Sequence, residues 1–142
     1  MSPATPFRIT GIIAILVAGV VAAAIAHHPT MPLVWMVAYL VLVAGVVQYA
    51  LGTAQAALMR QPLAMPVLWG LWLLLNVGQL LVVVASLQGN FMLLLAGTLL
   101  YDLAMLWFAL TVRNGQSGLL RIGYWILVIV MFISSLTGVV LF

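Results

Sequence analysis

The sequence predicts an all-α integral membrane protein, a bundle of five transmembrane helices, and two features of its composition carry this prediction. Of the 142 residues, 68% are hydrophobic and 4% are charged, whereas about a quarter of the residues of a soluble domain are charged. The cationic residues are four separate arginines, so the chain lacks the basic patch that binds nucleic acid. The composition therefore excludes a soluble domain and a nucleic-acid-binding protein, and it makes the lipid bilayer the expected surroundings.

The chain contains five apolar stretches of the length that a membrane span requires. A helix needs about 20 predominantly apolar residues to cross about 30 Å of hydrocarbon, because each residue advances about 1.5 Å. The remaining segments are too short to form a domain outside the membrane, so residues 1–142 are predicted to be a single transmembrane domain. The predicted spans are residues 9–26, 33–59, 67–87, 91–112 and 122–142.

The first span follows Arg8 and ends at His27, where polar residues and Pro29 interrupt the apolar run. The sequence Ala-Ile-Ala before His27 imitates the cleavage site of a secretory signal. Cleavage there would give His27 a free amine that could chelate copper together with His28. The apolar run is longer than a typical signal core, so we expect an uncleaved first helix.

The second and third spans form a hairpin around Arg60. The second begins after Pro32 and carries no charged residue before Arg60. The third begins after Pro66 and stays uncharged up to the polar turn at residues 88–90. The segments 27–32, 60–66 and 88–90 interrupt the apolar runs and so separate these spans.

The fourth and fifth spans are separated by a loop between two arginines, and the arginines together predict the orientation. In a five-span bundle all four arginines lie on one side, and short loops that carry arginine stay in the cytoplasm. We therefore expect a cytoplasmic N-terminus and a C-terminus, Phe142, on the outer side, in a bacterial cytoplasmic (inner) membrane. The topology-setting residues are Arg8, Arg60, Arg113 and Arg121.

Several polar side chains fall within the predicted spans at similar depth. Such residues are costly in hydrocarbon unless they face other helices and find partners there. In the second span Gly45, Gln48, Gly52 and Gln55 recur at steps of three and four, so they share one helix face. We expect the amides and hydroxyls to hydrogen-bond between helices and the glycines to allow close packing. The other polar candidates are Asn76, Gln79, Asp102, Ser134 and Ser135.

Asp102 differs from these residues because it is the sole acid in the chain and lies at the centre of the fourth span. An ionised aspartate there costs roughly 2.5–3.5 kcal/mol on insertion scales. Arg113 is eleven residues further along the helix, too far to pair with it. Asp102 is therefore expected to be uncharged, or to accept hydrogen bonds from neighbouring polar residues, or both. The expected donors are Asn76, Gln79, Gln48 and Tyr101.

The sequence predicts neither an enzyme nor a metal or cofactor site. The chain has no cysteine, one acid and two adjacent histidines, so it cannot form a carboxylate pair. A Ser/His/Asp triad would require Asp102, in the middle of the membrane, to reach His27 at its outer edge. His27 and His28, with nearby Met31 and Met36, are the weak candidate ligands for copper. Adjacent histidines cannot both face one site on a regular helix, so a polar turn is the preferred interpretation.

Two functions remain open at this stage. The first is an accessory or interaction subunit, or a self-assembling bundle, that binds a larger membrane complex or its own copies through polar stripes. The alternative is a small proton- or cation-coupled carrier or channel, expected to act as an oligomer. In it Asp102, Asn76, Gln79 and Gln48 bind a small cationic or amphiphilic ligand. A quinone- or copper-associated component is a third, minor interpretation.

Overall fold

The computed structural model describes residues 2–116 and 118–141. The chain is 84% helical, with no strand in this described part. The first helix is α1 (Thr5–Ile25), and the last three are α4 (Met65–Gln88), α5 (Phe91–Val112) and α6 (Leu119–Val140). Between α1 and α4, three consecutive segments form one continuous helix, Met31–Leu58, which we call the second span. Its segments are α2 (Met31–Tyr39), the π-helix η1 (Leu40–Val47) and α3 (Gln48–Leu58).

The structure confirms five helices that are long and apolar enough to cross a membrane. The bounds of the fourth helix agree with the prediction, and the first and fifth helices begin earlier than predicted. The first includes Arg8 because Pro6 occupies its first turn, where proline stabilises a helix start. The fifth includes Arg121, and its predicted last residue, Phe142, lies outside the described residues.

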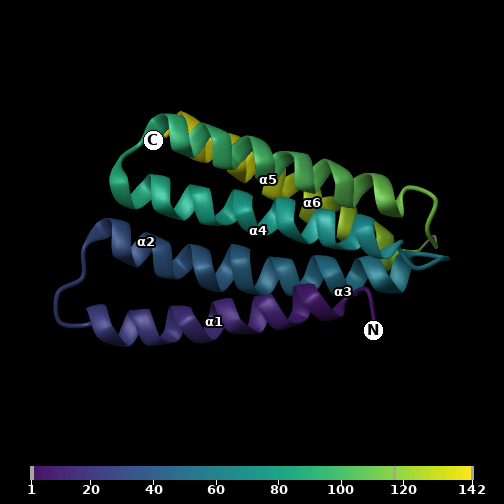
Figure 1. Ribbon diagram of the computed structural model, residues 1–142, viewed down its shortest axis with the longest axis horizontal. Coiled ribbons are helices and arrows are strands. Elements are labelled where there is room, and N and C mark those ends of the chain that lie inside the picture. Colours follow the sequence, from purple (N-terminus) through teal and green to yellow (C-terminus); the bar gives the residue numbers. More distant parts are fainter. Residues whose placement is uncertain (1, 117, 142) are drawn as a thin grey trace.

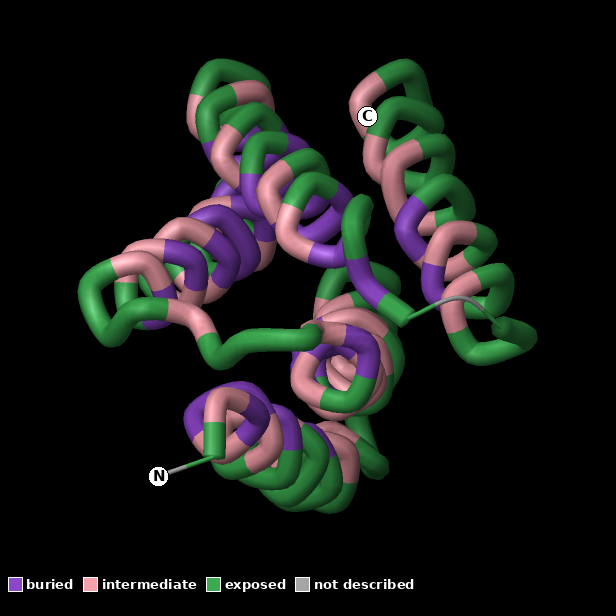
Figure 2. The backbone as a smooth tube through the Cα atoms, turned by 90° about the vertical axis from the view of Figure 1, so that its right-hand side faces the viewer, coloured by how far each residue is buried: buried purple, intermediate pink, exposed green. Residues whose placement is uncertain are grey.

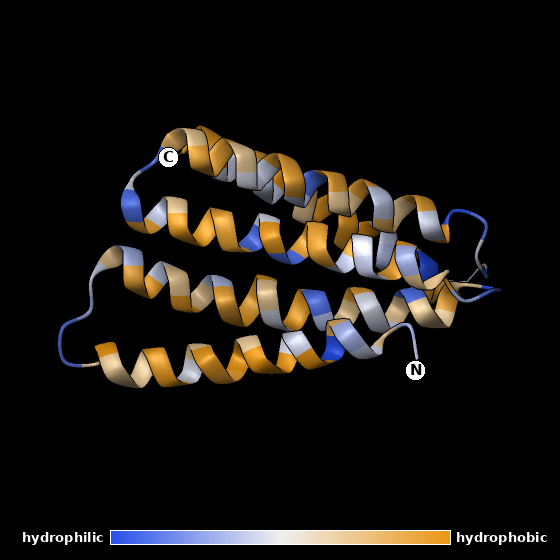
Figure 3. Cartoon of the chain, viewed as in Figure 1, coloured by the Kyte–Doolittle hydropathy of each residue, from blue (hydrophilic) through white to orange (hydrophobic). Residues whose placement is uncertain are grey.

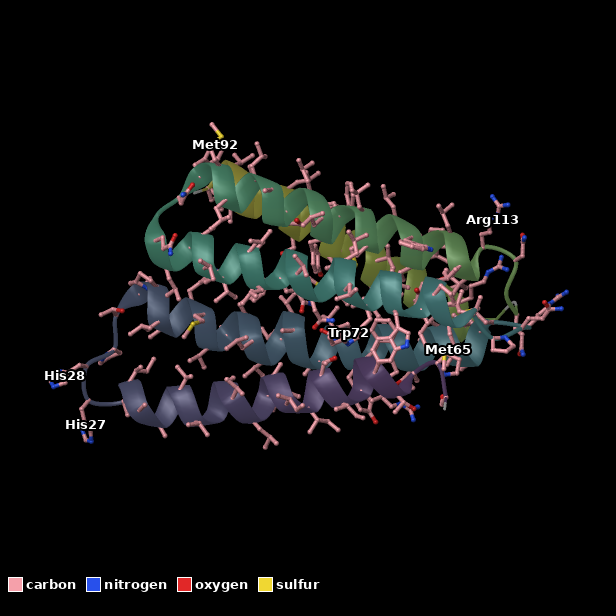
Figure 4. The ribbon with its side chains drawn as sticks, in the orientation of Figure 1. His27, His28, Met65, Trp72, Met92 and Arg113 are labelled. Carbon is pink, nitrogen blue, oxygen red and sulfur yellow. The ribbon has the colours of Figure 1, made fainter. Side chains whose placement is uncertain are left out.

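The helices run up and down, so that the bundle has two chemically different ends (Figure 1). The N-terminus and the loops with Arg60 and Arg113 lie at one end, here called the arginine end. The α1–α2 loop with His27 and His28, the α4–α5 turn and Leu141 lie at the other, the histidine end (Figure 4). Coloured by hydropathy, the helices are largely apolar and the loops are polar (Figure 3).

The helices pack as two pairs with α6 at the edge. α1 lies along the second span, α4 lies along α5, and α6 contacts α5 and the arginine-end segment α3. Exposed residues follow α6 along most of its length (Figure 2), and among its described residues only Tyr124 and Val128 are buried. One face of α6 is therefore used for packing near the arginine end, and little of it is used near the histidine end.

Glycines set the distance between the helices in both pairs. A Cβ added at Gly78 of α4 would lie 2.7 Å from the backbone nitrogen of Tyr101, and one at Gly97 of α5 would lie 2.8 Å from that of Val82. A Cβ at Gly45 would meet the Ile15 side chain of α1 at 2.5 Å. Packing at this distance supplies van der Waals contact, which drives helix association in lipid, where burial from water does not.

The apolar core is concentrated toward the arginine end. Its largest cluster includes Phe7, Leu71, Met105 and Phe108, all fully buried. Phe7 and Phe108 meet edge to face with ring centroids 5.3 Å apart. At the histidine end the buried cluster shrinks to three residues, namely Val82, Ala85 and Leu94. The bundle is thus tightly filled at one end and loosely filled at the other.

We predict that Gly78→Ala destabilises the bundle by about 1–3 kcal/mol, because the new methyl group would overlap backbone atoms of α5, which cannot move alone. Gly19→Ala is the matched control, since a Cβ there meets nothing within 4 Å. Unfolding in mixed micelles by titration with sodium dodecyl sulfate measures both changes. Equal stability of the two variants would contradict the close packing of α4 on α5.

Candidate functional site

A first group of polar side chains, the central cluster, joins three helices inside the arginine-end half of the bundle. Gln48 donates through Nε2 to the Thr10 hydroxyl of α1 and, at 3.2 Å, to Oδ1 of Asn76 on α4. Thr10 in turn donates to the Pro6 carbonyl at 2.8 Å. The indole N–H of Trp72, a half-buried side chain labelled in Figure 4, donates to the Thr10 hydroxyl at 3.4 Å. The central cluster therefore fixes α1, the second span and α4 to one another.

A second group joins the second span to α5 and α6. Gln55 donates through Nε2 to the Thr111 hydroxyl at 2.7 Å. The carbonyl of Phe108 accepts from the Thr111 hydroxyl at 2.8 Å and from the Tyr124 hydroxyl at 3.1 Å. Gln48 and Gln55 are fully buried or nearly so, and each retains one amide oxygen, Oε1, without a partner. Their donor groups are used within the chain.

Asp102 lies apart from both groups. It is buried, and none of the four expected donors, Asn76, Gln79, Gln48 and Tyr101, hydrogen-bonds to it in the described structure. Gln79 is also buried and makes no side-chain hydrogen bond there. The acid and the amides that the sequence places at similar depth are therefore separated, because their helices turn them toward different neighbours.

The surroundings of Asp102 come from three helices. Ser135 on α6 lies close enough to the carboxyl group to influence it electrostatically, and Oδ1 of Asp102 is buried without a hydrogen-bond partner. The hydroxyl of Tyr101, the preceding residue of α5, is likewise buried without a partner. Tyr39, at the end of α2, is close enough to both Tyr101 and Asp102 to interact with them electrostatically. Asp102 therefore has three hydroxyl-bearing neighbours, and none of the described residues is a cationic partner for it.

A cavity of about 1140 Å³ opens beside this group, in the loosely filled half of the bundle. We call it the lateral cavity. Its walls are the α2 and η1 segments of the second span and α6, and residues of α4 and α5 complete it. Most of its surface is apolar, and the polar part consists of hydroxyl groups and one indole. The polar residues of the lining include Trp35, Tyr39, Thr98, Tyr101, Ser134 and Ser135.

The lining determines which ligands the lateral cavity can accept. No arginine or histidine lines it, so it offers no charge to an anion. Thr98 and Ser134 make no side-chain hydrogen bond in the described structure, so their two hydroxyls are available to a ligand, whereas the unpartnered hydroxyl of Tyr101 is buried. The described residues contain no group of three or more His, Cys, Asp or Glu that could hold a metal ion. The cavity therefore suits an apolar molecule with a polar group.

The remaining predicted residues lie at the two ends. Arg8 donates through Nε to the Thr53 hydroxyl at 2.9 Å, and its guanidinium lies 5.7 Å from the centroid of the Tyr49 ring. Arg121 donates to the Gly115 carbonyl at 3.4 Å, and Arg60 and Arg113 are exposed. His27 and His28 are exposed in the opposite loop (Figure 4). No arginine is near Asp102, because all four lie at the arginine end.

Sequence reasoning missed several residues that the structure brings into these sites. Thr10 was missed because a single threonine in an apolar helix gives no periodic signal. Tyr39 was missed for a different reason, since a tyrosine in the outer half of a span is typical of a membrane interface. Its stacking on Trp35, with centroids 5.1 Å apart, could have been found from the spacing of four residues.

Comparison with known protein families, with curated proteins and with solved structures finds no match for this chain.

We predict that Gln48→Met destabilises the chain by about 1–2 kcal/mol, because interhelical hydrogen bonds in membranes contribute on the order of 0.6 kcal/mol each and Gln48 makes two. Gln88→Met, at the exposed end of α4, is the matched control and should leave stability unchanged. Titration with sodium dodecyl sulfate again measures stability. In a double-mutant cycle with Asn76→Leu, strictly additive losses would show that the Gln48–Asn76 bond is not formed.

Proposed function

We propose that the chain is a small membrane-embedded binding protein and that the lateral cavity is its binding site for a small amphiphilic molecule. The observation that carries this proposal is a large cavity with apolar walls and unpartnered hydroxyl groups. Small-molecule sites have this character, with mostly apolar walls and a few polar groups that orient the ligand. The proposal corresponds to the carrier interpretation of the sequence, with Tyr101 and its neighbours in place of Asn76, Gln79 and Gln48.

The use of the other polar residues supports this choice. Gln48, Gln55 and Asn76 hydrogen-bond between helices of the same chain. They are therefore occupied in holding the bundle together and are not turned outward toward a partner. Among the polar residues of the described helices, Thr98 and Ser134 combine an unpartnered hydroxyl with a place in the cavity wall, which supports binding at the cavity.

An accessory or interaction subunit is the second candidate, and the exposure of α6 favours it. Only Tyr124 and Val128 of its described residues are buried, and Ile126, Ile129 and Ile133 are each more than half exposed. A helix from a second copy or from a larger complex could cover this face. In that case the polar group behind α6 would serve the assembly of helices and not a small ligand.

The chain offers a clean test of the first candidate, because it contains no cysteine. In Ser134→Cys the single thiol lies in the lateral cavity, and we expect at least one lipophilic probe to slow its alkylation by N-ethylmaleimide. The probes are tetraphenylphosphonium, tetraphenylborate and decylubiquinone. Ile133→Cys is the matched control, since the neighbouring residue is exposed and does not line the cavity.

Protection of Ser134→Cys alone supports a binding site. Equal slowing of both variants would mean that the probes act through the bilayer, and no slowing would overturn the proposal. Disulfide-linked dimers of Ile133→Cys after mild oxidation, with no protection of Ser134→Cys, would favour the second candidate.

The proposal includes an orientation, with the arginine end in the cytoplasm and the lateral cavity in the outer half of a bacterial inner membrane. The positions of the four arginines support it, because cytoplasmic loops are enriched in arginine. In intact cells, a membrane-impermeant maleimide should label Thr30→Cys and leave Gln61→Cys unlabelled until the cells are opened. Both residues are exposed in loops at opposite ends of the bundle. The reverse pattern of labelling would invert the orientation.

A further inference from the structure

We infer that the ligand of the lateral cavity is a lipophilic organic cation and that the carboxylate of Asp102 neutralises its charge. This inference rests on the proposed function and names the class of molecule that the cavity takes. Four observations support it, namely the charge of the chain, the groups around Asp102, the aromatic wall and the absence of competing titratable groups.

Asp102 is the sole acid of the chain. It is buried among residues of α5, α6 and the second span, and the four arginines lie at the arginine end of the bundle. A carboxylate in a membrane interior is usually paired with a cation or lies beside a substrate or ion pathway. None of the described residues supplies a cation here, so a proton or a bound cation has to complete the site.

The groups around Asp102 connect it to the cavity. Tyr101 and Thr98 lie on the same helix, one residue and one turn before the acid, and both line the cavity. Ser135 of α6 lies close enough to the carboxyl group to interact with it, and it lines the cavity as well. Oδ1 of Asp102 and the hydroxyl of Tyr101 are buried and unpartnered. Asp102 does not itself line the cavity but lies directly behind the lining residues Thr98, Tyr101 and Ser135, so a ligand's charge would act on the carboxyl group across this short layer.

The walls of the cavity suit a cation with large apolar substituents. Trp35 and Tyr39 stack with an interplanar angle of 29°, and both line the cavity with Tyr101. The faces of aromatic rings attract cations, and this attraction is strongest when the cation has lost its water. The volume of about 1140 Å³ is at the upper end of small-molecule sites, so several rings fit. No cationic side chain lines the cavity, so the lining offers no positive charge to stabilise a bound anion.

A proton and an organic cation should compete for Asp102, because each neutralises the same carboxylate. The titratable groups that face it are Tyr39 from the second span and Tyr101 from its own helix. The sequence of α4 contains no titratable residue, and α6 carries only Arg121 and Tyr124, both near the arginine end. Tyrosine stays uncharged near neutral pH, so Asp102 is the group whose titration should control binding.

The test compares two probes of the same shape and opposite charge, tetraphenylphosphonium and tetraphenylborate, by equilibrium dialysis against the full chain in dodecyl maltoside. We expect the cation to bind at least about 100-fold more tightly than the anion, since like charges repel strongly at a desolvated site. Its apparent dissociation constant should rise by about tenfold for each unit of pH below the range in which the carboxyl group is ionised.

Substitutions at Asp102 provide the second part of the test. Asp102→Asn should weaken cation binding by about tenfold or more and remove its pH dependence, whereas Asp102→Glu should retain both. Circular dichroism and sodium dodecyl sulfate titration establish that the variants fold. If Asp102→Asn does not fold, Asp102→Glu and the pH dependence of the unaltered chain decide the question.

Binding of tetraphenylphosphonium that is unchanged in Asp102→Asn, or equal to that of tetraphenylborate, would overturn the inference. The cysteine experiment distinguishes this failure from failure of the proposed function. If tetraphenylborate or decylubiquinone protects Ser134→Cys and tetraphenylphosphonium does not, the cavity is a binding site for a different class of ligand. If no probe protects the thiol, the inference and the proposed function both fail.

Discussion

A hydrogen-bonding side chain within a bilayer has no water to bind, and the arrangement of this bundle depends on that constraint. Gln48 donates hydrogen bonds to Thr10 and Asn76, which joins three helices, and Gln55 donates to Thr111 on a fourth helix. These contacts act with the glycine interfaces, which bring the helix backbones close enough for short amide and hydroxyl side chains to meet. Asp102 differs from these amides because no side-chain hydrogen bond joins its carboxyl group to another helix in the described structure, and its Oδ1 is buried without a partner.

Because the bundle is packed unevenly, Asp102 lies beside the lateral cavity. Large buried residues such as Phe7 and Phe108 gather toward the arginine end, and the buried cluster toward the histidine end is small. The second span and α6 consequently separate where the lateral cavity lies. A loosely filled region next to an unpartnered carboxyl group is a poor source of stability, and this is why we assign it to binding.

The five spans could be predicted from the sequence because hydropathy and length depend on local composition alone. The division of the polar residues into separate groups could not be predicted from the sequence. Gln48 and Asp102 lie at similar depth, but their partners depend on how each helix is rotated about its axis. The π-helical segment Leu40–Val47 changes that rotation within the second span, because its wider turns shift the face on which later residues lie. The hydrophobic periodicity of a single apolar helix does not predict such a shift of face.

The attachment of α6 at one end has a mechanical consequence. Its buried residues Tyr124 and Val128, and the hydrogen bond from Tyr124 to the Phe108 carbonyl, all lie in its first half. A small tilt about this anchor would widen or narrow the far end without disturbing the glycine-packed pairs α1 with the second span and α4 with α5. The wall of the lateral cavity that α6 and its C-cap supply, from Met131 to Leu141, therefore contains no buried residue and is the wall least fixed by packing.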